Sequence, residues 1–192
     1  MIFDSTPCEL GEGALWHPGR QALFWFDILH KRLRMKDAAG LTVWDLQDLT
    51  SAAAILSQDA LLLASESALW RFDSATGSQS RLVALDAEDS GTRSNDGRAD
   101  RQGGFWIGTM GKRGGGDPGR GSIWRWYRGE MRRIFTGLTI PNSICFDATG
   151  TRMYFCDSVT PRILHCSYDA ATASVSDIAV FVDLDLTGAE PD

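Results

Sequence analysis

The sequence lacks the features that mark several large classes of protein. No run of about 18 apolar residues occurs, so we expect no transmembrane helix. The N-terminal segment has no basic stretch followed by an apolar one, so we expect no secretory signal. The net charge is −6 and the 19 Lys and Arg residues are scattered, which argues against nucleic acid or an anionic membrane as a partner. Helical periodicity is nearly absent.

Motifs of common enzyme classes are also missing. There is no GxSxG or HExxH motif, and residues 108–112 lack the spacing of a phosphate-binding loop. The glycine run at 114–116 predicts a flexible loop. His17, His30 and His165 are far apart in sequence, and we expect each in a turn or on the surface. The four cysteines form no CxxC pair, and three lie in strand-like runs, which predicts buried thiols in a reducing, cytoplasmic compartment.

What the sequence does contain is a weak repeat of short apolar runs, each bounded by turn residues. Aligning Phe24, Leu62, Trp106 and Tyr154 gives steps of roughly 38, 44 and 48 residues. Apolar runs with aromatic residues are typical of strands and hairpins, and this spacing is that of one four-stranded propeller blade per repeat. The pattern therefore predicts an all-β propeller. A β-sandwich is the alternative, but its strands need no repeat of this length.

About four repeats are visible before the chain ends in a loop-like segment, residues 184–192. Each blade of a propeller buries its faces against two neighbours. We therefore expect residues 1–192 to form a single, incomplete β-propeller domain whose open blade edges favour self-association. A closed four-bladed ring is the alternative.

Polar residues stand at the boundaries between loops and strands, about once per repeat. Glu12 precedes the first apolar run, Asn95 and Asp96 precede the third, Asn142 opens the fourth, and Asp192 lies where a fifth would open. Equivalent positions in different blades converge on the central channel, where such side chains would form an all-oxygen site suited to a hard divalent cation. Each residue alone would be read as a turn or a cap, but their recurrence favours the metal site.

At these residues the sequence resembles the gluconolactonase/regucalcin (senescence marker protein) family of six-bladed β-propeller, metal-dependent sugar lactonases. The matching segments follow the family's order and are residues 10–18, 24–28, 94–100, 104–110, 137–143, 153–158 and 191–192. The resemblance implies that about four of the six blades are present and that about a third of the family's length is missing after residue 192. The segment after Met110 lacks an acidic residue that animal members use, and it looks more like bacterial sugar lactonases.

The resemblance also implies roles for individual residues. Glu12, Asn142 and Asp192 would bind one divalent cation (Ca, Zn, Mg, Mn or Fe), while Arg93 and Asn95 would bind the substrate. The cation would polarise the carbonyl of a sugar lactone, such as gluconolactone or a pentonolactone, and Asp192 would be the catalytic base for the attacking water. The product would be the aldonic acid.

Three other functions stay open from the sequence. They are a non-catalytic calcium-binding propeller, a phosphotriesterase-like hydrolase with the same metal geometry, and an inactive fragment. One departure from the family concerns the metal site, because Ser143 stands where a glycine often follows the ligand asparagine. The sequence does not determine the metal, the lactone, the pathway or the oligomeric state.

Overall fold

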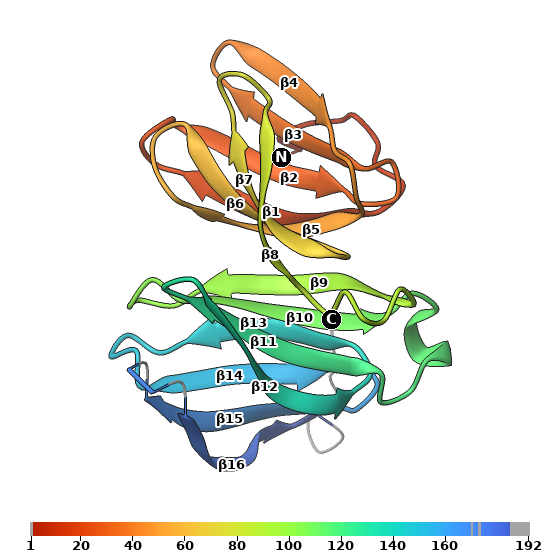
Figure 1. Cartoon of the computed structure of the whole chain (residues 1–192), viewed down its shortest axis with the longest axis vertical. Helices are drawn as coiled ribbons and strands as arrows, with labels where there is room; N and C mark the ends of the chain where they lie inside the picture. The colour runs from red at the N-terminus through yellow and green to blue at the C-terminus, as the bar shows by residue number, and fades with distance from the viewer. Residues whose placement is uncertain (1, 170, 173, 185–192) are drawn as a thin grey trace.

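The structure is a computed structural model that describes residues 2–169, 171–172 and 174–184. Within that part, the chain forms four antiparallel sheets of four strands each, and strands pair in the order in which they occur. Each sheet is therefore one blade, completed before the next begins. Figure 1 shows the first two blades in the upper half of the molecule and the last two in the lower half. The all-β class and the four blades predicted from the sequence are confirmed.

The sixteen strands are assigned to the blades in chain order. Blade 1 comprises β1 (Gly11–His17), β2 (Ala22–Asp27), β3 (Arg32–Asp37) and β4 (Gly40–Asp45). Blade 2 comprises β5 (Thr50–Ile55), β6 (Ala60–Ser65), β7 (Ala68–Asp73) and β8 (Gln79–Ala84). Blade 3 comprises β9 (Thr92–Ala99), β10 (Phe105–Gly111), β11 (Gly121–Tyr127) and β12 (Glu130–Leu138). Blade 4 comprises β13 (Pro141–Phe146), β14 (Arg152–Asp157), β15 (Arg162–Asp169) and β16 (Ser174–Asp183).

The four aligned residues of the sequence repeat fall on equivalent strands. Phe24 lies on β2, Leu62 on β6, Trp106 on β10 and Tyr154 on β14, each the second strand of its blade. β6 and β10 are buried at every residue because a blade covers each of their faces. β2 and β14 belong to the first and last of the four blades, and each has partly exposed residues. The spacing of the apolar runs was therefore a sound guide to the blades.

The hydrophobic core lies between successive blades. Phe24, Phe26 and Leu33 of blade 1 pack with Leu61 and Phe72 of blade 2. A second cluster joins blades 2 and 3, and a third joins blades 3 and 4. Since burial of a large apolar side chain contributes about 1.5–3 kcal/mol, these clusters fix the blades against one another.

The first strands of the blades, β1, β5, β9 and β13, lie side by side in that order at the inner edge of the arc. Each contains a break in its register with the second strand of its blade. Such a β-bulge leaves one residue unpaired, bends the strand and redirects side chains. The sequence placed the polar residues in front of the strands; the structure places them inside, at the bulges. The bulges hide these strands from sequence analysis because they interrupt the alternation of apolar and polar residues.

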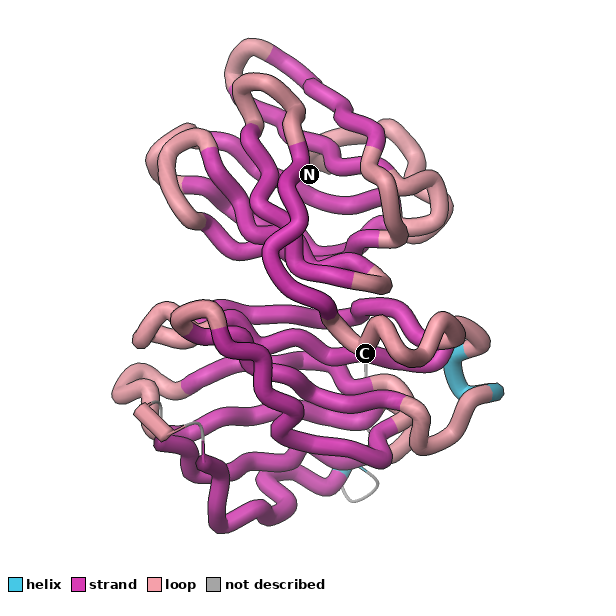
Figure 2. Tube along the Cα trace, in the orientation of Figure 1, coloured by secondary structure: helices cyan, strands magenta, loops and turns pink. Residues whose placement is uncertain are grey.

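Several smaller predictions were wrong. His17 is buried at the end of β1, where its Nε2 lies 3.1 Å from the Ser57 carbonyl oxygen, and His165 lies within β15. Cys145 is exposed on β13, although Cys156 and Cys166 are buried as predicted. The glycine run lies in the loop between β10 and β11, as predicted, where it forms a short 3-10 turn, η1 (Gly114–Gly116), drawn in cyan at the right-hand edge of Figure 2. No helix among the described residues is long and apolar enough to cross a membrane.

Candidate metal and substrate site

A small polar cavity of about 30 Å³ lies where the bulges of the inner strands meet. Its lining residues are Glu12, Gly13, Ser51, Asn95, Asp96 and Asn142. Four residues that the sequence singled out, Glu12, Asn95, Asp96 and Asn142, thus come together from β1, β9 and β13. The volume is close to the space that one water molecule takes up in the liquid, and it suits a single small ion. Asp192, the predicted base and third ligand, lies outside the described residues.

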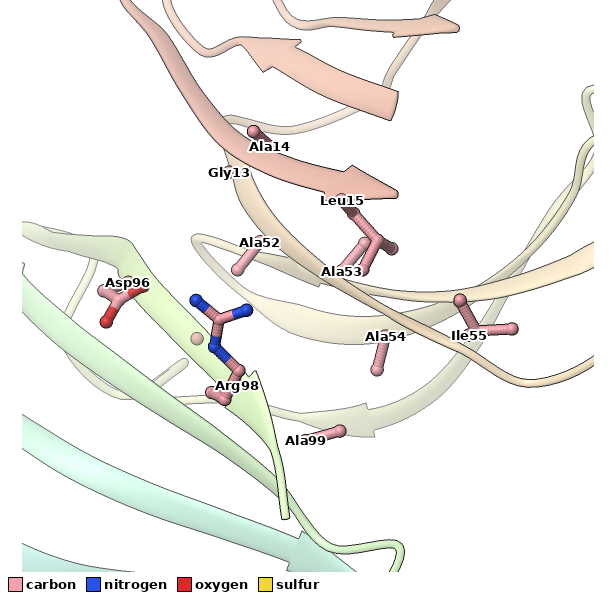
Figure 3. A pocket seen from close by; sticks show the side chains of 11 residues that line it. Gly13, Ala14, Leu15, Ala52, Ala53, Ala54, Ile55, Asp96, Arg98 and Ala99 are labelled. Atoms are coloured by element: carbon pink, nitrogen blue, oxygen red, sulfur yellow. The ribbon is translucent and has the colours of Figure 1, made fainter. Parts of the chain in front are cut away.

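A larger hollow lies along the inner strands and shares Gly13 and Asp96 with this cavity. Figure 3 shows Asp96 and Arg98 on β9 beside the small side chains of Ala52 and Ala53 on β5. This hollow has a volume of about 430 Å³, which is within the range of small-molecule sites. Space of the size that a sugar derivative requires therefore lies beside the polar cavity.

Glu12 is presented by the bulge of β1, in which Gly13 has a φ of +65°. A Cβ atom at Gly13 would lie 2.1 Å from the Ser51 carbonyl oxygen and 2.8 Å from Cδ2 of Phe26. Only glycine allows the backbone of β1 to approach β5 this closely. The Glu12 residue is exposed to solvent, and no hydrogen bond engages its carboxylate within the described part of the chain. Its oxygens are accessible to a ligand.

Arg93 and Asn95 are linked on β9. Arg93 Nη1 donates to the Ser94 carbonyl oxygen at 2.8 Å and to Asn95 Oδ1 at 3.3 Å. Burial lowers the pKa of Arg93, and the nearby negative charge of Glu12 counteracts this shift in part. The guanidinium stays charged because its ordinary pKa is far above neutrality. Arg93 does not line the small cavity itself, but it lies close enough to complement the charge of Glu12.

Asn142 is presented by the bulge of β13, which repeats the geometry of β1. Its Nδ2 donates to Ser158 Oγ at 3.4 Å, and its Oδ1 accepts from the Ser143 backbone N–H at 3.2 Å. Ser143 has a φ of +58°, close to the value at Gly13. A carbonyl oxygen has two lone pairs, so Oδ1 keeps capacity for one more partner. The serine thus occupies a position whose backbone conformation favours glycine.

Sequence reasoning missed two aspartates that hold the segments leading to the predicted ligands. Asp27 ends β2 opposite Gly11, and Asp157 ends β14 opposite Pro141. Asp27 Oδ1 accepts from the backbone N–H groups of Glu9 and Leu10 at 3.2 and 3.4 Å. The only signal for either residue in the sequence was an apolar run that ends in aspartate, and such an ending is also common in ordinary turns.

The second of these aspartates makes the same kind of contact in blade 4. Asp157 accepts from the backbone N–H groups of Thr139 and Ile140, both at 2.8 Å. Each carboxylate therefore fixes the backbone a few residues before a predicted ligand, Glu12 in blade 1 and Asn142 in blade 4.

The donor set fits a hard cation. The carboxylate of Glu12 and the amide oxygens of Asn95 and Asn142 are all oxygen donors of the kind that Ca²⁺, Mg²⁺ and Mn²⁺ prefer. No group of three or more His, Cys, Asp or Glu side chains with the arrangement of a metal site occurs among the described residues.

Comparison with known proteins gives concordant results. Residues 10–192 match the family model described as SMP-30/Gluconolactonase/LRE-like region. A putative sugar lactone lactonase of Rhizobium meliloti is 32% identical over 167 residues, covering 86% of this chain and 56% of that protein. The L-arabinolactonase of Azospirillum brasilense is 34% identical over 199 residues, covering 100% of this chain and 65% of that protein.

A solved structure is similar as well. The calcium-binding protein regucalcin from Agrobacterium tumefaciens superposes with a TM-score of 0.89 at 38% identity, covering 94% of this chain and 61% of that one. The chain thus spans less than two thirds of the length of each of these three proteins.

Proposed function

This chain belongs to the SMP-30/gluconolactonase/LRE-like family, and we propose that the protein hydrolyses the ester bond of a sugar lactone to give the aldonic acid. The observation that carries the proposal is the meeting of Glu12, Asn95 and Asn142 at one polar cavity, with Arg93 bonded to Asn95. Relatives described as a sugar lactone lactonase and an L-arabinolactonase support this choice of substrate class.

We propose that Glu12 and Asn142 hold a divalent cation, with Asp192 as the third protein ligand. The oxygen-only donor set and the similarity to a calcium-binding regucalcin support a divalent ion. When bound, such an ion supplies Lewis-acid polarisation of the lactone carbonyl and stabilises the negative charge that develops on its oxygen.

The chain's own residues would bind and orient the substrate. The Arg93 guanidinium is already held by the Ser94 carbonyl and by Asn95, so little further ordering is needed when it donates to a lactone oxygen. The Asn95 amide would add a hydrogen bond to a sugar hydroxyl. Asp192 would take the proton from the attacking water. A cytoplasmic location, expected from the cysteines, stays a prediction.

A second candidate function is cation binding without turnover, and the calcium-binding description of the similar regucalcin structure favours it. It shares the cation site and differs only in catalysis. An assay of hydrolysis alongside a measurement of cation binding therefore separates the two functions.

The test uses a panel of five- and six-membered aldonolactones, with acid release followed by a pH indicator in the presence of Mn²⁺, Ca²⁺ or EDTA. We expect cation-dependent acceleration over spontaneous ring opening, abolished by EDTA and lowered at least about 100-fold in Glu12→Gln, since loss of a ligand removes the cation. Cation binding without acceleration would establish the non-catalytic function. Cleavage of an organophosphate ester but no lactone would establish the phosphotriesterase alternative.

A further inference from the structure

Asp96 is a second carboxylate at the polar cavity, and the proposed ligand set, Glu12, Asn142 and Asp192, does not include it. It lines the cavity together with Glu12. Its Oδ2 atom accepts a hydrogen bond from the backbone N–H of Ile144 at 2.6 Å, reaching from blade 3 to blade 4. This short contact joins the bulge of β9 to the bulge of β13.

The bulge of β13 creates the need for such an acceptor. Asn142 pairs with Cys156 and Cys145 with Tyr154, so Ser143 and Ile144 together face a single residue of β14. A bulge disrupts the hydrogen-bond ladder locally and leaves a backbone group without its usual partner. The Ile144 side chain is only 1% exposed and packs in the core between blades 3 and 4. Asp96 supplies the acceptor that β14 does not.

The residue next to Asp96 makes a matching contact on the other side of Asn142. Asn95 Nδ2 donates to the carbonyl oxygen of Pro141 at 3.2 Å. Two adjacent side chains of β9 therefore hold the residue before Asn142 and the second residue after it. We call this pair of contacts the β9 clamp. Asn142 lies inside the clamp, and its backbone is fixed on both sides by blade 3.

We infer that Asp96 is a positioning residue that sets the orientation of the Asn142 amide toward a bound divalent cation, through the Ile144 N–H. This inference rests on the proposed cation site. Asp96 acts through geometry: one oxygen accepts from the Ile144 N–H, and without that bond the β9 clamp would hold the segment around Ser143, at a φ of +58°, from the Pro141 side alone. Partners that orient metal ligands in this way typically change metal affinity by about 10–100-fold when removed.

The test compares Asp96→Ala with Asp96→Asn, because asparagine keeps an oxygen that accepts from Ile144 but carries no charge. The readouts are the dissociation constant for Mn²⁺ by calorimetry, the electron paramagnetic resonance spectrum of bound Mn²⁺, and amide exchange at Ile144. We expect Asp96→Ala to weaken Mn²⁺ binding at least about tenfold, to alter the spectrum and to speed exchange at Ile144. Asp96→Asn should stay within about threefold of the unmodified protein in affinity and keep its spectrum.

Two further variants separate the possible failures. Asp147→Ala is the matched control, since Asp147 also accepts from backbone N–H groups, those of Thr151 and Arg152, but in a turn away from the cavity. It should leave Mn²⁺ affinity unchanged.

If Glu12→Gln abolishes Mn²⁺ binding and Asp96→Ala leaves it unchanged, the positioning role is refuted while the cation site stands. Equal losses in Asp96→Asn and Asp96→Ala refute it as well, because charge would then be decisive. Absence of Mn²⁺ binding in the unmodified protein overturns the cation site and the inference with it.

Discussion

Gly13 and Ser143 hold the same left-handed backbone conformation, with φ values of +65° and +58°, although they lie in blades 1 and 4. Each directly follows a predicted metal ligand, Glu12 or Asn142, in a bulge of an inner strand. The two ligands are thus presented by the same local geometry, repeated in two blades. Substitutions at Gly13 and at Ser143 should nevertheless change the stability of the protein in opposite directions, because the atoms around the two residues differ.

Gly13→Ala should be strongly destabilising. The added Cβ would lie 2.1 Å from the Ser51 carbonyl oxygen, so β1 must move away from β5. We expect the free energy of unfolding to fall by about 3 kcal/mol or more, part from left-handed strain and the rest from lost packing. Gly129→Ala is the control, since Gly129 has a φ of +86° and no atom within 4 Å of the added Cβ. Equal losses in urea unfolding of the two variants would show that β1 does not pack on β5 as described.

Ser143→Gly should have the opposite effect. Glycine adopts a positive φ without strain, and relief of that strain, about 1–2 kcal/mol, exceeds the entropy that glycine loses, about 0.5–1 kcal/mol. We expect a gain of up to about 1 kcal/mol in the free energy of unfolding, with unchanged Mn²⁺ affinity. Ser143→Val places a β-branched residue there and should destabilise. A less stable glycine variant in urea titrations would contradict the assignment.

Protonation of the Asp27 carboxylate should contribute to unfolding of the protein at low pH. Burial alone would raise the pKa of this carboxyl, but hydrogen bonds from His30 and from the backbone N–H of Leu10 outweigh it and hold the pKa below the ordinary value of 3.8. A lowered pKa means that the stabilisation is complete above the unfolded-state pKa and is lost as the pH falls through the folded-state value.

Asp27→Asn imitates the protonated form, so it should lower stability at pH 6 and matter progressively less below about pH 4. The check is urea unfolding of both proteins from pH 6 to pH 3. A difference that stays constant across this range would show that folding does not shift the pKa of Asp27. Asp45→Asn is the control, because the Asp45 side chain is 89% exposed and should contribute little.

We propose that an exposed apolar patch on β16 drives the self-association expected from the sequence. Ile178, Val180 and Phe181 are each about half exposed, at 54%, 47% and 55%. The Phe181 ring packs on those of Tyr154 and His165, with centroids 4.9 and 6.0 Å apart. Phe181→Ser should shift sedimentation-velocity profiles of the 192-residue chain toward the monomer, whereas Leu82→Ser on β8 should not. Identical profiles for both variants would rule out this patch.

The sequence predicted the parts of the molecule that are encoded by repetition. Apolar runs recur because the second strand of each blade is largely buried. This recurrence placed Phe24, Leu62, Trp106 and Tyr154 on equivalent strands. Glu12, Asn95 and Asn142 were singled out because polar residues recur beside the apolar runs, and the structure brings these three to one cavity, while their role as ligands stays a prediction. Both signals are local patterns that recur along the chain.

The unpredicted features depend on contacts between distant residues. Nothing near Asp96 in the sequence indicates that its partner is the N–H of Ile144, 48 residues later. His17 is buried because Ser57 of the next blade covers it, which no local pattern shows. The bulges were missed because an extra residue removes the alternation by which a strand is identified.

The candidate site also has a mechanical consequence for the protein. Glu12 belongs to the first blade and Asn142 to the fourth, and the first two blades meet the last two chiefly where β5 lies beside β9. An ion bound by both residues would connect the first blade to the fourth, and so link the two halves seen in Figure 1. The free energy needed to separate the first two blades from the last two would then rise with the ion's concentration, because only the folded arrangement brings both Glu12 and Asn142 within reach of the ion.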